Sequence, residues 1–321
     1  MVMMRQSMTS PFASRNQAPP RTARVPIACA AFVLALLAGA ATFPCETRAQ
    51  IAGTGVPDLE NDLVTASVVA DMSAIAPGKP FRLAVRLAPR EGWHLNWLNP
   101  GDAGLAPSVK WHLPEGFTAG PPWWPLPERF PTGPLVIFGY SGELLLVVDV
   151  RSPARLDAAG KLEFRAEVSW LACNDACIPG SADVALTLPV RDTAAVDPTW
   201  QARIDDSMAR CPQPSLAWSV AASVDDQGMV ALDIGPGDDS LRLEDVFFYP
   251  YEPGIIENAA PQRLSVLAGP TGRAAYQLRV ELSRMAAAVP SRLSGVLVSR
   301  SGWSGGDGAR AIEIDVPLGR R

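Results

Sequence analysis

Residues 161–170 carry the most regular pattern in the chain, Lys161-Leu162-Glu163-Phe164-Arg165-Ala166-Glu167-Val168-Ser169-Trp170. Apolar and polar side chains alternate at every position, which is typical of a β-strand with one buried and one solvent-exposed face. The same alternation returns just downstream, at Val184, Leu186, Leu188 and Val190. The two segments predict a β-hairpin whose link is formed by the residues between them.

Period-two alternation is also more common than helical spacing in the rest of the chain. Phe81, Leu83, Val85 and Leu87, for example, should share one face of a strand. Hydrophobic residues make up 48% of the 321 residues, which is enough for real cores, and 31 Pro and 26 Gly favour many turns. We therefore expect an all-β protein with two β-sandwich domains.

One segment departs from this pattern and divides the chain. Asp197-Pro198 is a favourable helix start, and Trp200, Ile204 and Met208 then follow one turn apart. The proline-rich residues 211–214 should end this helix. We predict a first sandwich at 50–196, a helical linker at 197–214 and a second sandwich at 215–321.

The second sandwich should contain at least four strands and a turn between the first two of them. The expected strands are 216–222, 230–234, 276–282 and 312–318, and the expected turn is 225–228. We find no chemical motif in this region.

Residues 1–49 have the layout of a secretory signal. Arg15, Arg21 and Arg24 precede an apolar run at 25–41, which is shorter than the roughly 20 residues that comfortably span a bilayer. We expect export and cleavage after Ala49, with residues 38–40 as a competing cleavage site and an uncleaved anchor as the alternative. Cys45 would leave with the signal.

Charge excludes one class of partner. Removing residues 1–49 takes five Arg and one Glu from the 28 basic and 33 acidic side chains, which leaves a net charge of −9. A chain this acidic, without a basic stripe, is repelled by phosphate backbones. We therefore expect no nucleic-acid partner.

Three cysteines would remain, namely Cys173, Cys177 and Cys211. Oxidising surroundings favour a disulfide between Cys173 and Cys177, which lie at the strand end of the predicted hairpin. So small a loop contributes only about 2 kcal/mol, so stability alone is a weak reason for the bond. Continued alternation would place Cys173 on the polar face with Glu167 and Ser169, which suggests access to a partner.

Several interpretations of these residues stay open. The disulfide could be a permanent staple of the hairpin or a redox-active pair. His94 and His112 could complete a zinc set with the cysteines, but they lack ligand spacing, and we predict no metal and no cofactor. Cys211 would be an inert buried thiol.

A binding module without catalysis is a further possibility. Five tryptophans could stack on sugar rings or, in the alternative, anchor strands and cores. They are Trp93, Trp97, Trp111, Trp123 and Trp124.

The cysteine segment runs Val168-Ser169-Trp170-Leu171-Ala172-Cys173-Asn174-Asp175-Ala176-Cys177-Ile178-Pro179-Gly180. It resembles the periplasmic N-terminal domain of DsbD-type thiol:disulfide interchange proteins, most closely the ScsB-like branch. Further agreement lies in residues 92–94 and 99–104, 124–130 and 138–143, and, in the second sandwich, 246–250 and 260–262. The resemblance thus covers nearly all of the chain after residue 49.

The resemblance implies immunoglobulin-like sandwiches and a periplasmic thiol:disulfide oxidoreductase. Its cysteine pair would receive electrons from a membrane-embedded reductase of the DsbD, ScsB or CcdA type and pass them to thioredoxin-fold proteins. By position, Cys177 would form the mixed disulfide and Cys173 would resolve it. Residues Phe138, Gly139 and Tyr140 would form a loop that caps the pair, with core packing as the alternative.

The sequence also departs from the family pattern. The best-known members separate their cysteines by five residues rather than three, and they carry a membrane segment and a thioredoxin-like domain on the same chain. We identify neither feature in this sequence and therefore expect the electrons to come from a separate protein. Asn96 and Ser141 stand where an aromatic and an acidic residue are expected. A redox-silent binding or assembly module with a structural disulfide is the alternative function.

Overall fold

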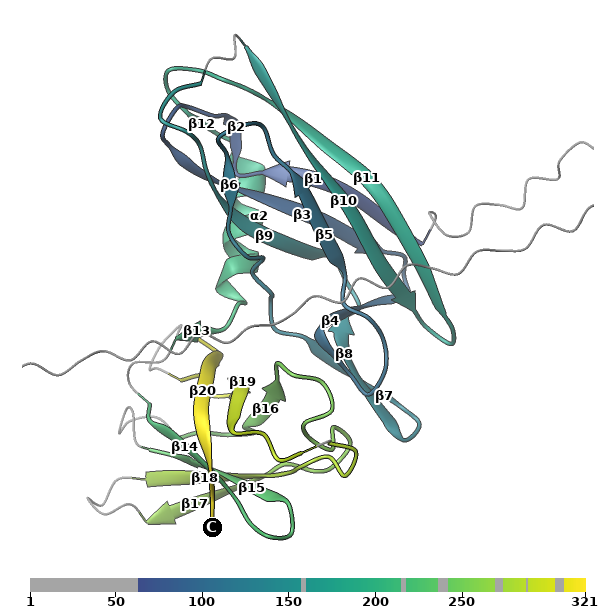
Figure 1. Cartoon of the computed structure of the whole chain (residues 1–321), viewed down its shortest axis with the longest axis vertical. Coiled ribbons are helices and arrows are strands. Elements are labelled where there is room, and N and C mark those ends of the chain that lie inside the picture. The colour runs from purple at the N-terminus through teal and green to yellow at the C-terminus, as the bar shows by residue number, and fades with distance from the viewer. Residues whose placement is uncertain are drawn as a thin grey trace, which may run out of the picture. The chain divides into compact units, whose positions relative to one another are not determined.

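The structure is a computed structural model that describes residues 63–156, 160–214, 218–235, 242–268, 274–286, 288–303 and 309–321. Residues 54–321 form one compact unit. The predicted fold class is confirmed, because strands dominate and two immunoglobulin-like β-sandwiches are joined by a short helix (Figure 1). The predicted signal at 1–49 lies outside the described residues, and the predicted domain boundaries stay a prediction.

The first sandwich contains strands β1 to β12. Their bounds are β1 Val64–Ala70, β2 Met72–Ala74, β3 Pro80–Pro89, β4 His94–Gly101, β5 Ser108–His112, β6 Thr118–Ala119, β7 Glu128–Thr132, β8 Leu135–Tyr140, β9 Leu144–Arg151, β10 Lys161–Cys173, β11 Cys177–Pro189 and β12 Ala195–Val196. One sheet has the order β1-β3-β9-β6, and the other has the order β11-β10-β4-β8-β7 with β5 paired to β10. The short strands β2 and β12 pair with each other.

The alternating segments of the sequence line the core between these two sheets. Phe81, Leu83, Val85 and Leu87 are all buried on β3, as predicted. They meet the apolar face of β10, where Phe164 is fully buried and packs edge to face against Phe81 at a centroid distance of 5.6 Å. One strand from each sheet thus supplies matched apolar faces, which is the usual construction of a sandwich core.

The predicted hairpin is confirmed, and it is the longest strand pair among the described residues. β10 and β11 pair without a break from Lys161 opposite Pro189 to Cys173 opposite Cys177 (Figure 1). Because this register is continuous, the cysteines lie at the end of a long regular ladder. Their positions are therefore fixed by the alternation upstream.

The predicted helix is confirmed as α2, Pro198–Ala209. The Asp197 carboxylate caps it by accepting hydrogen bonds from the backbone N–H groups of Thr199 and Trp200. Trp200, Ile204 and Met208 pack on the outer face of the four-stranded sheet, against residues such as Leu145. The helix therefore covers a sheet of the first sandwich as well as linking the two sandwiches.

An ionic contact fastens this helix to the sheet. The Glu143 carboxylate accepts hydrogen bonds from Arg86 on β3 and Arg203 on α2. Burial works to raise the Glu143 pKa, but the hydrogen bonds from Arg203 and Arg86 outweigh it, so the pKa lies below its ordinary value of 4.5. A carboxyl with a depressed pKa stabilises the fold above the ordinary value, and this stabilisation is lost as the pH falls through the folded-state pKa.

Glu143→Gln should therefore lower the free energy of unfolding by about 1–2 kcal/mol at neutral pH. The deficit should shrink as the pH falls below 4.5, because wild-type Glu143 then becomes neutral as well. Urea unfolding over a pH series measures both effects. Glu163→Gln is the control, since its exposed pair with Arg165 should contribute less than about 1 kcal/mol. A deficit that stays constant with pH would contradict this account.

The second sandwich contains strands β13 to β20. Their bounds are β13 Gln213–Pro214, β14 Val220–Val224, β15 Met229–Ile234, β16 Phe247–Pro250, β17 Arg263–Ala268, β18 Ala274–Glu281, β19 Arg292–Val298 and β20 Ala311–Arg320. They follow the order β16-β19-β20-β14-β15-β18-β17, with β13 paired to β20. Three of the predicted strands match β15, β18 and β20 closely, and the predicted turn at 225–228 is closed by a hydrogen bond from Gly228 N to Asp225 O.

Aromatic side chains pack the two sandwiches against each other. Trp97 and Phe138 of the first sandwich lie 6.0 and 5.0 Å from the Tyr249 ring of the second. The Arg129 guanidinium lies 4.1 Å from the centroid of the Phe247 ring. Tyr249 is buried and belongs to the core cluster of the first sandwich. The contact is therefore part of a packed core.

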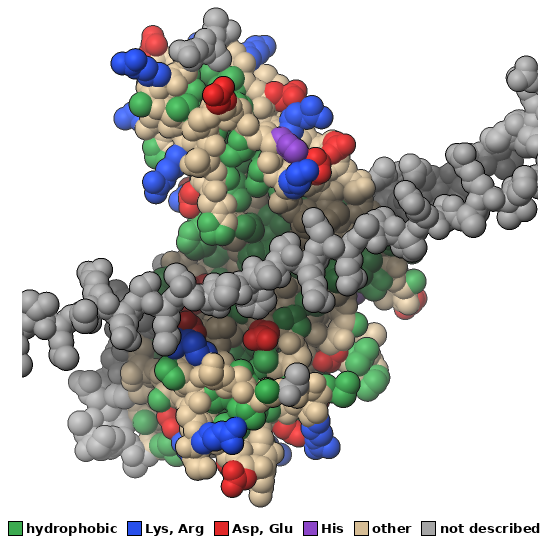
Figure 2. All heavy atoms as spheres, viewed as in Figure 1, with side chains coloured by type: hydrophobic (Ala, Val, Ile, Leu, Met, Phe, Trp, Pro, Cys, Tyr) green, Lys and Arg blue, Asp and Glu red, His purple; other side chains and the backbone are tan. Residues whose placement is uncertain are grey.

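The visible face of the molecule carries charged side chains of both signs. Figure 2 shows acidic and basic side chains interspersed on the face turned to the viewer, without a broad patch of one sign. In the described part of the chain no helix has the length and apolar character needed to cross a bilayer.

Candidate functional site

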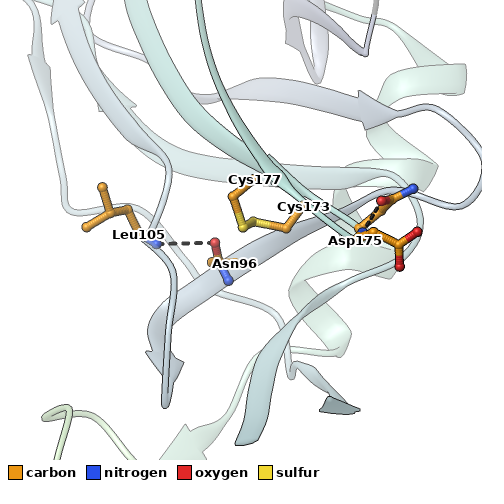
Figure 3. The surroundings of a disulfide bond; sticks show 6 residues. Asn96, Leu105, Cys173, Asp175 and Cys177 are labelled. Carbon is orange, nitrogen blue, oxygen red and sulfur yellow. Dashed lines mark hydrogen bonds between the residues drawn. A yellow bond between two sulfur atoms is a disulfide. The ribbon is translucent and has the colours of Figure 1, made fainter. Parts of the chain in front are cut away.

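The candidate site is the disulfide at the tip of the β10–β11 hairpin. Cys173 ends β10, Cys177 begins β11, and a bond joins their sulfur atoms (Figure 3). The turn between them is closed by a hydrogen bond of 3.0 Å from Asn174 N to Ala176 O. The Asp175 amide also donates to the Asn174 side chain. The predicted bond is therefore present, in a turn held by its own backbone and an Asn side chain.

The two cysteines differ in exposure. Cys177 is exposed, whereas Cys173 is only 3% exposed. The register does carry Cys173 onto the same face as Glu167 and Ser169, as predicted. The expected access is nevertheless wrong for Cys173, because β4 joins β10 at this end and places His94 directly opposite Cys173. Of the two cysteines, Cys177 is therefore open to solvent and Cys173 is buried.

An aromatic stack lies on the cysteine face of the sheet. The rings of His94 on β4 and Phe130 on β7 are nearly parallel, at 14°, with centroids 4.8 Å apart. Strand β8 runs between β4 and β7, so the two side chains meet across it. Gly139 of β8 leaves this space open, and the backbone there is so close that an added Cβ would lie 2.1 Å from Leu95 O. Burial lowers the pKa of His94, which keeps its ring neutral at neutral pH.

The predicted cap residues lie in a strand rather than a loop. Phe138, Gly139 and Tyr140 are the last three residues of β8 and all are buried. Gly139 lies opposite Asn96, on the cysteine face, so Phe138 and Tyr140 point to the other face. There the Tyr140 hydroxyl donates to Pro125 O at 2.7 Å, and Phe138 packs against Trp97. These contacts fit the alternative interpretation, in which the three residues pack in the core. A capping role stays a prediction.

The histidines considered as metal ligands are not brought together. His94 lies opposite Cys173, whereas His112 lies opposite Arg165, far along the same strand. His112 Nε2 instead lies 2.6 Å from a carboxylate oxygen of Glu167. Among the described residues there is no group of three or more His, Cys, Asp or Glu side chains that could hold a metal ion.

The tryptophans considered as a binding surface are mostly packed. Trp97 is fully buried, and Trp93, Trp111 and Trp124 pack against the core of the first sandwich. Trp123 is 37% exposed, and its indole N–H donates to Asp149 at 3.0 Å. These positions fit strand and core anchoring rather than a stacking platform.

Cys211 is buried near the end of α2, and it is the free cysteine of the described residues. Burial raises the pKa of its thiol to about 12. Only the thiolate attacks electrophiles, and at this pKa its fraction at neutral pH is on the order of 10⁻⁵. The expected inert thiol fits this environment.

Cys211 should therefore resist alkylation in the folded protein. In the reduced, folded protein iodoacetamide should modify Cys177 first and leave Cys211 unmodified, as peptide mass spectrometry can show. Unfolding in urea is the control, because Cys173, Cys177 and Cys211 should then react alike. Modification of Cys211 at the rate of Cys177 in the folded protein would contradict the assignment of an inert thiol.

One residue beside the disulfide has an unusual environment that the sequence did not reveal. Asn96 is fully buried, and its Oδ1 accepts a hydrogen bond of 3.2 Å from Leu105 N (Figure 3). Its Nδ2 has no hydrogen-bond partner among the residues that the structure describes. The sequence singled out Asn96 only as a departure from the family pattern, since nothing in the local sequence indicates which side chains are buried with it.

The residues that follow Asn96, from Asn99 to Asp102, are anchored to the second sandwich. Asn99 Nδ2 donates to Pro250 O at 2.8 Å, and Asn258 Nδ2 donates to Asp102 Oδ1 at 2.8 Å. The other Asp102 oxygen accepts from Val136 N at 2.7 Å. The Asn-Pro-Gly-Asp run is thus a connector between the disulfide region and the second sandwich.

Comparisons with known proteins agree with this arrangement. Residues 60–189 match the family model described as thiol:disulfide interchange protein DsbD, N-terminal. The fold is similar to the crystal structure of the N-terminal periplasmic domain of ScsB from Proteus mirabilis, with a TM-score of 0.55, 18% identity, and coverage of 81% of this chain and 95% of that chain.

Other solved structures are less similar. A marsupial T cell receptor has a TM-score of 0.20 and 13% identity, with coverage of 79% of this chain and 95% of that chain. The major pilin subunit BcpA of Bacillus cereus has a TM-score of 0.25 and 8% identity, with coverage of 80% and 69%. A search of curated proteins finds no match to the sequence. The family match and the fold of the ScsB domain support a DsbD-type N-terminal domain over residues 60–189.

Proposed function

We propose that the protein is a thiol:disulfide exchange relay that works through Cys173 and Cys177. The observation that carries this proposal is the asymmetric disulfide in a DsbD-type domain, with Cys177 exposed and Cys173 buried. Exchange requires one sulfur that a partner can reach and a second sulfur beside it that completes the reaction. A staple of the hairpin would not need this asymmetry, since the ladder of β10 and β11 already fixes the turn.

The proposed reaction starts from the reduced pair. The Cys177 thiolate attacks one sulfur of the partner's disulfide, which forms a mixed disulfide and releases the partner's other sulfur as a thiolate. The Cys173 thiolate then attacks the Cys177 sulfur, restores the Cys173–Cys177 bond and releases the partner's second thiolate. Two electrons pass to the partner, and the protons lost by the pair are taken up by the partner's thiolates or by water.

The partners follow from the family and from the chemistry. The proposed electron acceptor is a periplasmic thioredoxin-fold protein, and the proposed donor is a dithiol of a membrane-embedded thiol reductase. A periplasmic location fits both the exported N-terminus that the sequence predicts and the stability of a disulfide outside the cytoplasm. No metal or other cofactor takes part in the proposed reaction.

A transfer assay with purified proteins tests the proposal. The protein is reduced, freed of dithiothreitol and mixed with an oxidised thioredoxin-fold protein from a periplasm, and thiols are blocked and counted by mass. We expect this protein to lose two thiols as the partner gains two. Cys211→Ser should transfer normally, and the double variant Cys173→Ser, Cys177→Ser should not transfer. A wild-type protein that keeps its thiols beside a partner that stays oxidised would contradict the proposal.

A further inference from the structure

We propose that the Asn96 carboxamide donates a hydrogen bond to the Cys173 sulfur in the reduced protein, and that this bond favours the reduced form of the pair. The inference rests on the proposed function, because it concerns how the same pair is tuned. The Asn96 Nδ2 is a buried donor that has no hydrogen-bond partner among the described residues.

The strand register places the carboxamide beside the sulfur. His94 lies directly opposite Cys173, and Asn96 follows two residues later on β4, so both side chains are on the cysteine face. Diagonal neighbours across a strand pair are within reach of side chains of this length. Figure 3 shows the Asn96 side chain close to the Cys173–Cys177 bond, between that bond and the loop at Leu105.

The surrounding loop holds the carboxamide but leaves one of its polar atoms unpaired. Asn96 Oδ1 accepts from Leu105 N, whereas Nδ2 has no partner in the described part of the chain. The backbone of Gly104 lies directly against the carboxamide, since an added Cβ there would be 2.4 Å from Nδ2. Gly104 also has a φ of 118°, which favours glycine. The loop therefore closes over Asn96 and pairs with its Oδ1 but not with its Nδ2.

Burial of a hydrogen-bond donor without a partner costs free energy. The redox state of the pair decides how good an acceptor the Cys173 sulfur is for this donor. A disulfide sulfur is a weak acceptor, but a thiolate is a charged acceptor that forms stronger hydrogen bonds. Reduction also breaks the bond to Cys177, so the Cys173 side chain can turn about its Cα–Cβ bond toward the carboxamide. The donor is thus unsatisfied in the oxidised protein and satisfied in the reduced protein, which favours reduction.

The charged groups near the pair do not supply this stabilisation. His94, opposite Cys173, is neutral at neutral pH because burial lowers its pKa. Glu128 shares the cysteine face, two strands beyond Asn96, and its carboxylate is bound by Ser141. Asp175 lies in the turn between the cysteines. Both acids oppose a thiolate, so a neutral donor is the group suited to stabilise it.

The test compares Asn96→Leu, which is similar in size and has no donor, with Asn96→Asp, which places an acceptor there. The Cys173 thiol pKa is measured by thiolate absorbance in a Cys177→Ser background, and the intact pair is equilibrated with glutathione. For Asn96→Leu we expect the pKa to rise by about one unit, and at a pH above the thiol pKa of both proteins the equilibrium should shift about tenfold toward the disulfide, which corresponds to about 30 mV. Asn96→Asp should shift both quantities in the same direction by more.

Asn258→Ala is the matched control, because it loosens the same loop from the second sandwich without touching the disulfide. It should change neither the acid dissociation constant of the Cys173 thiol nor the equilibrium with glutathione by more than about twofold. Folded Asn96→Leu and Asn96→Asp variants that keep the wild-type pKa and equilibrium would overturn the inference, as would equal shifts in Asn258→Ala. A wild-type pair that glutathione does not reduce at all would instead contradict the proposed function, so the two failures are distinguishable.

Discussion

Replacing Cys173 by Ser should trap a mixed disulfide through Cys177, whereas replacing Cys177 by Ser should trap almost none. The reason is the difference in exposure, since Cys177 is exposed and Cys173 is 3% exposed beneath the sheet end. Without Cys173 no neighbouring thiolate can resolve the intermediate, so it accumulates. We expect a difference on the order of tenfold or more in trapped complex, because only the exposed sulfur is accessible to the partner's disulfide.

Trapping is measured in periplasmic extract after acid quenching and alkylation, on gels without reductant. Cys211→Ser is the control and should trap no more than the wild-type protein. It keeps Cys173 as the resolving cysteine and loses only a buried, protonated thiol. Identification of the attached protein by mass spectrometry tests the thioredoxin-fold class of partner. Trapping only in Cys177→Ser would reverse the roles of the two cysteines.

Replacing Trp97 by Ala should be the most destabilising of the substitutions considered. Trp97 is fully buried and contacts Phe138 of its own sandwich and both Tyr249 and Tyr251 of the second. Truncation of a buried Trp removes a large apolar surface and leaves a cavity, which costs about 3–5 kcal/mol. Because the contact joins the two sandwiches, we expect their unfolding to lose cooperativity.

Urea unfolding monitored by circular dichroism measures the loss in the free energy of unfolding, and calorimetry measures the loss of cooperativity. Trp123→Ala is the matched control, since the same side chain is 37% exposed there and its removal should cost less than about 1.5 kcal/mol. A loss below about 1 kcal/mol for Trp97→Ala would show that the aromatic contact between the sandwiches contributes little.

Patterns that depend on neighbours in sequence were predictable. The alternation at 161–170 gave the hairpin, because side-chain direction in a strand has a period of two. The Asp197 cap and the spacing of Trp200, Ile204 and Met208 gave helix α2. In each case the physical cause lies within about ten residues of the element. The cysteine pair was likewise placed correctly at the strand end.

Features that depend on pairing between distant strands were not predictable. The burial of Cys173 follows from the pairing of β4 with β10, which joins residues far apart in the chain. The side chains on the cysteine face, His94, Asn96 and Phe130, come from two separate strands. Phe138 and Tyr140 belong to β8 and turn away from the pair, which no local pattern indicates. Such assignments require the register of the whole sheet.

The reduction potential of the Cys173–Cys177 pair tests the central claim most directly. The protein is equilibrated with glutathione buffers of known ratio, thiols are alkylated at each point, and the reduced fraction is determined by mass. An exchange relay predicts a potential in the range of exchangeable pairs, above about −300 mV. A potential far below that value, where structural disulfides resist reduction, would contradict the claim and leave the pair as a staple of the hairpin.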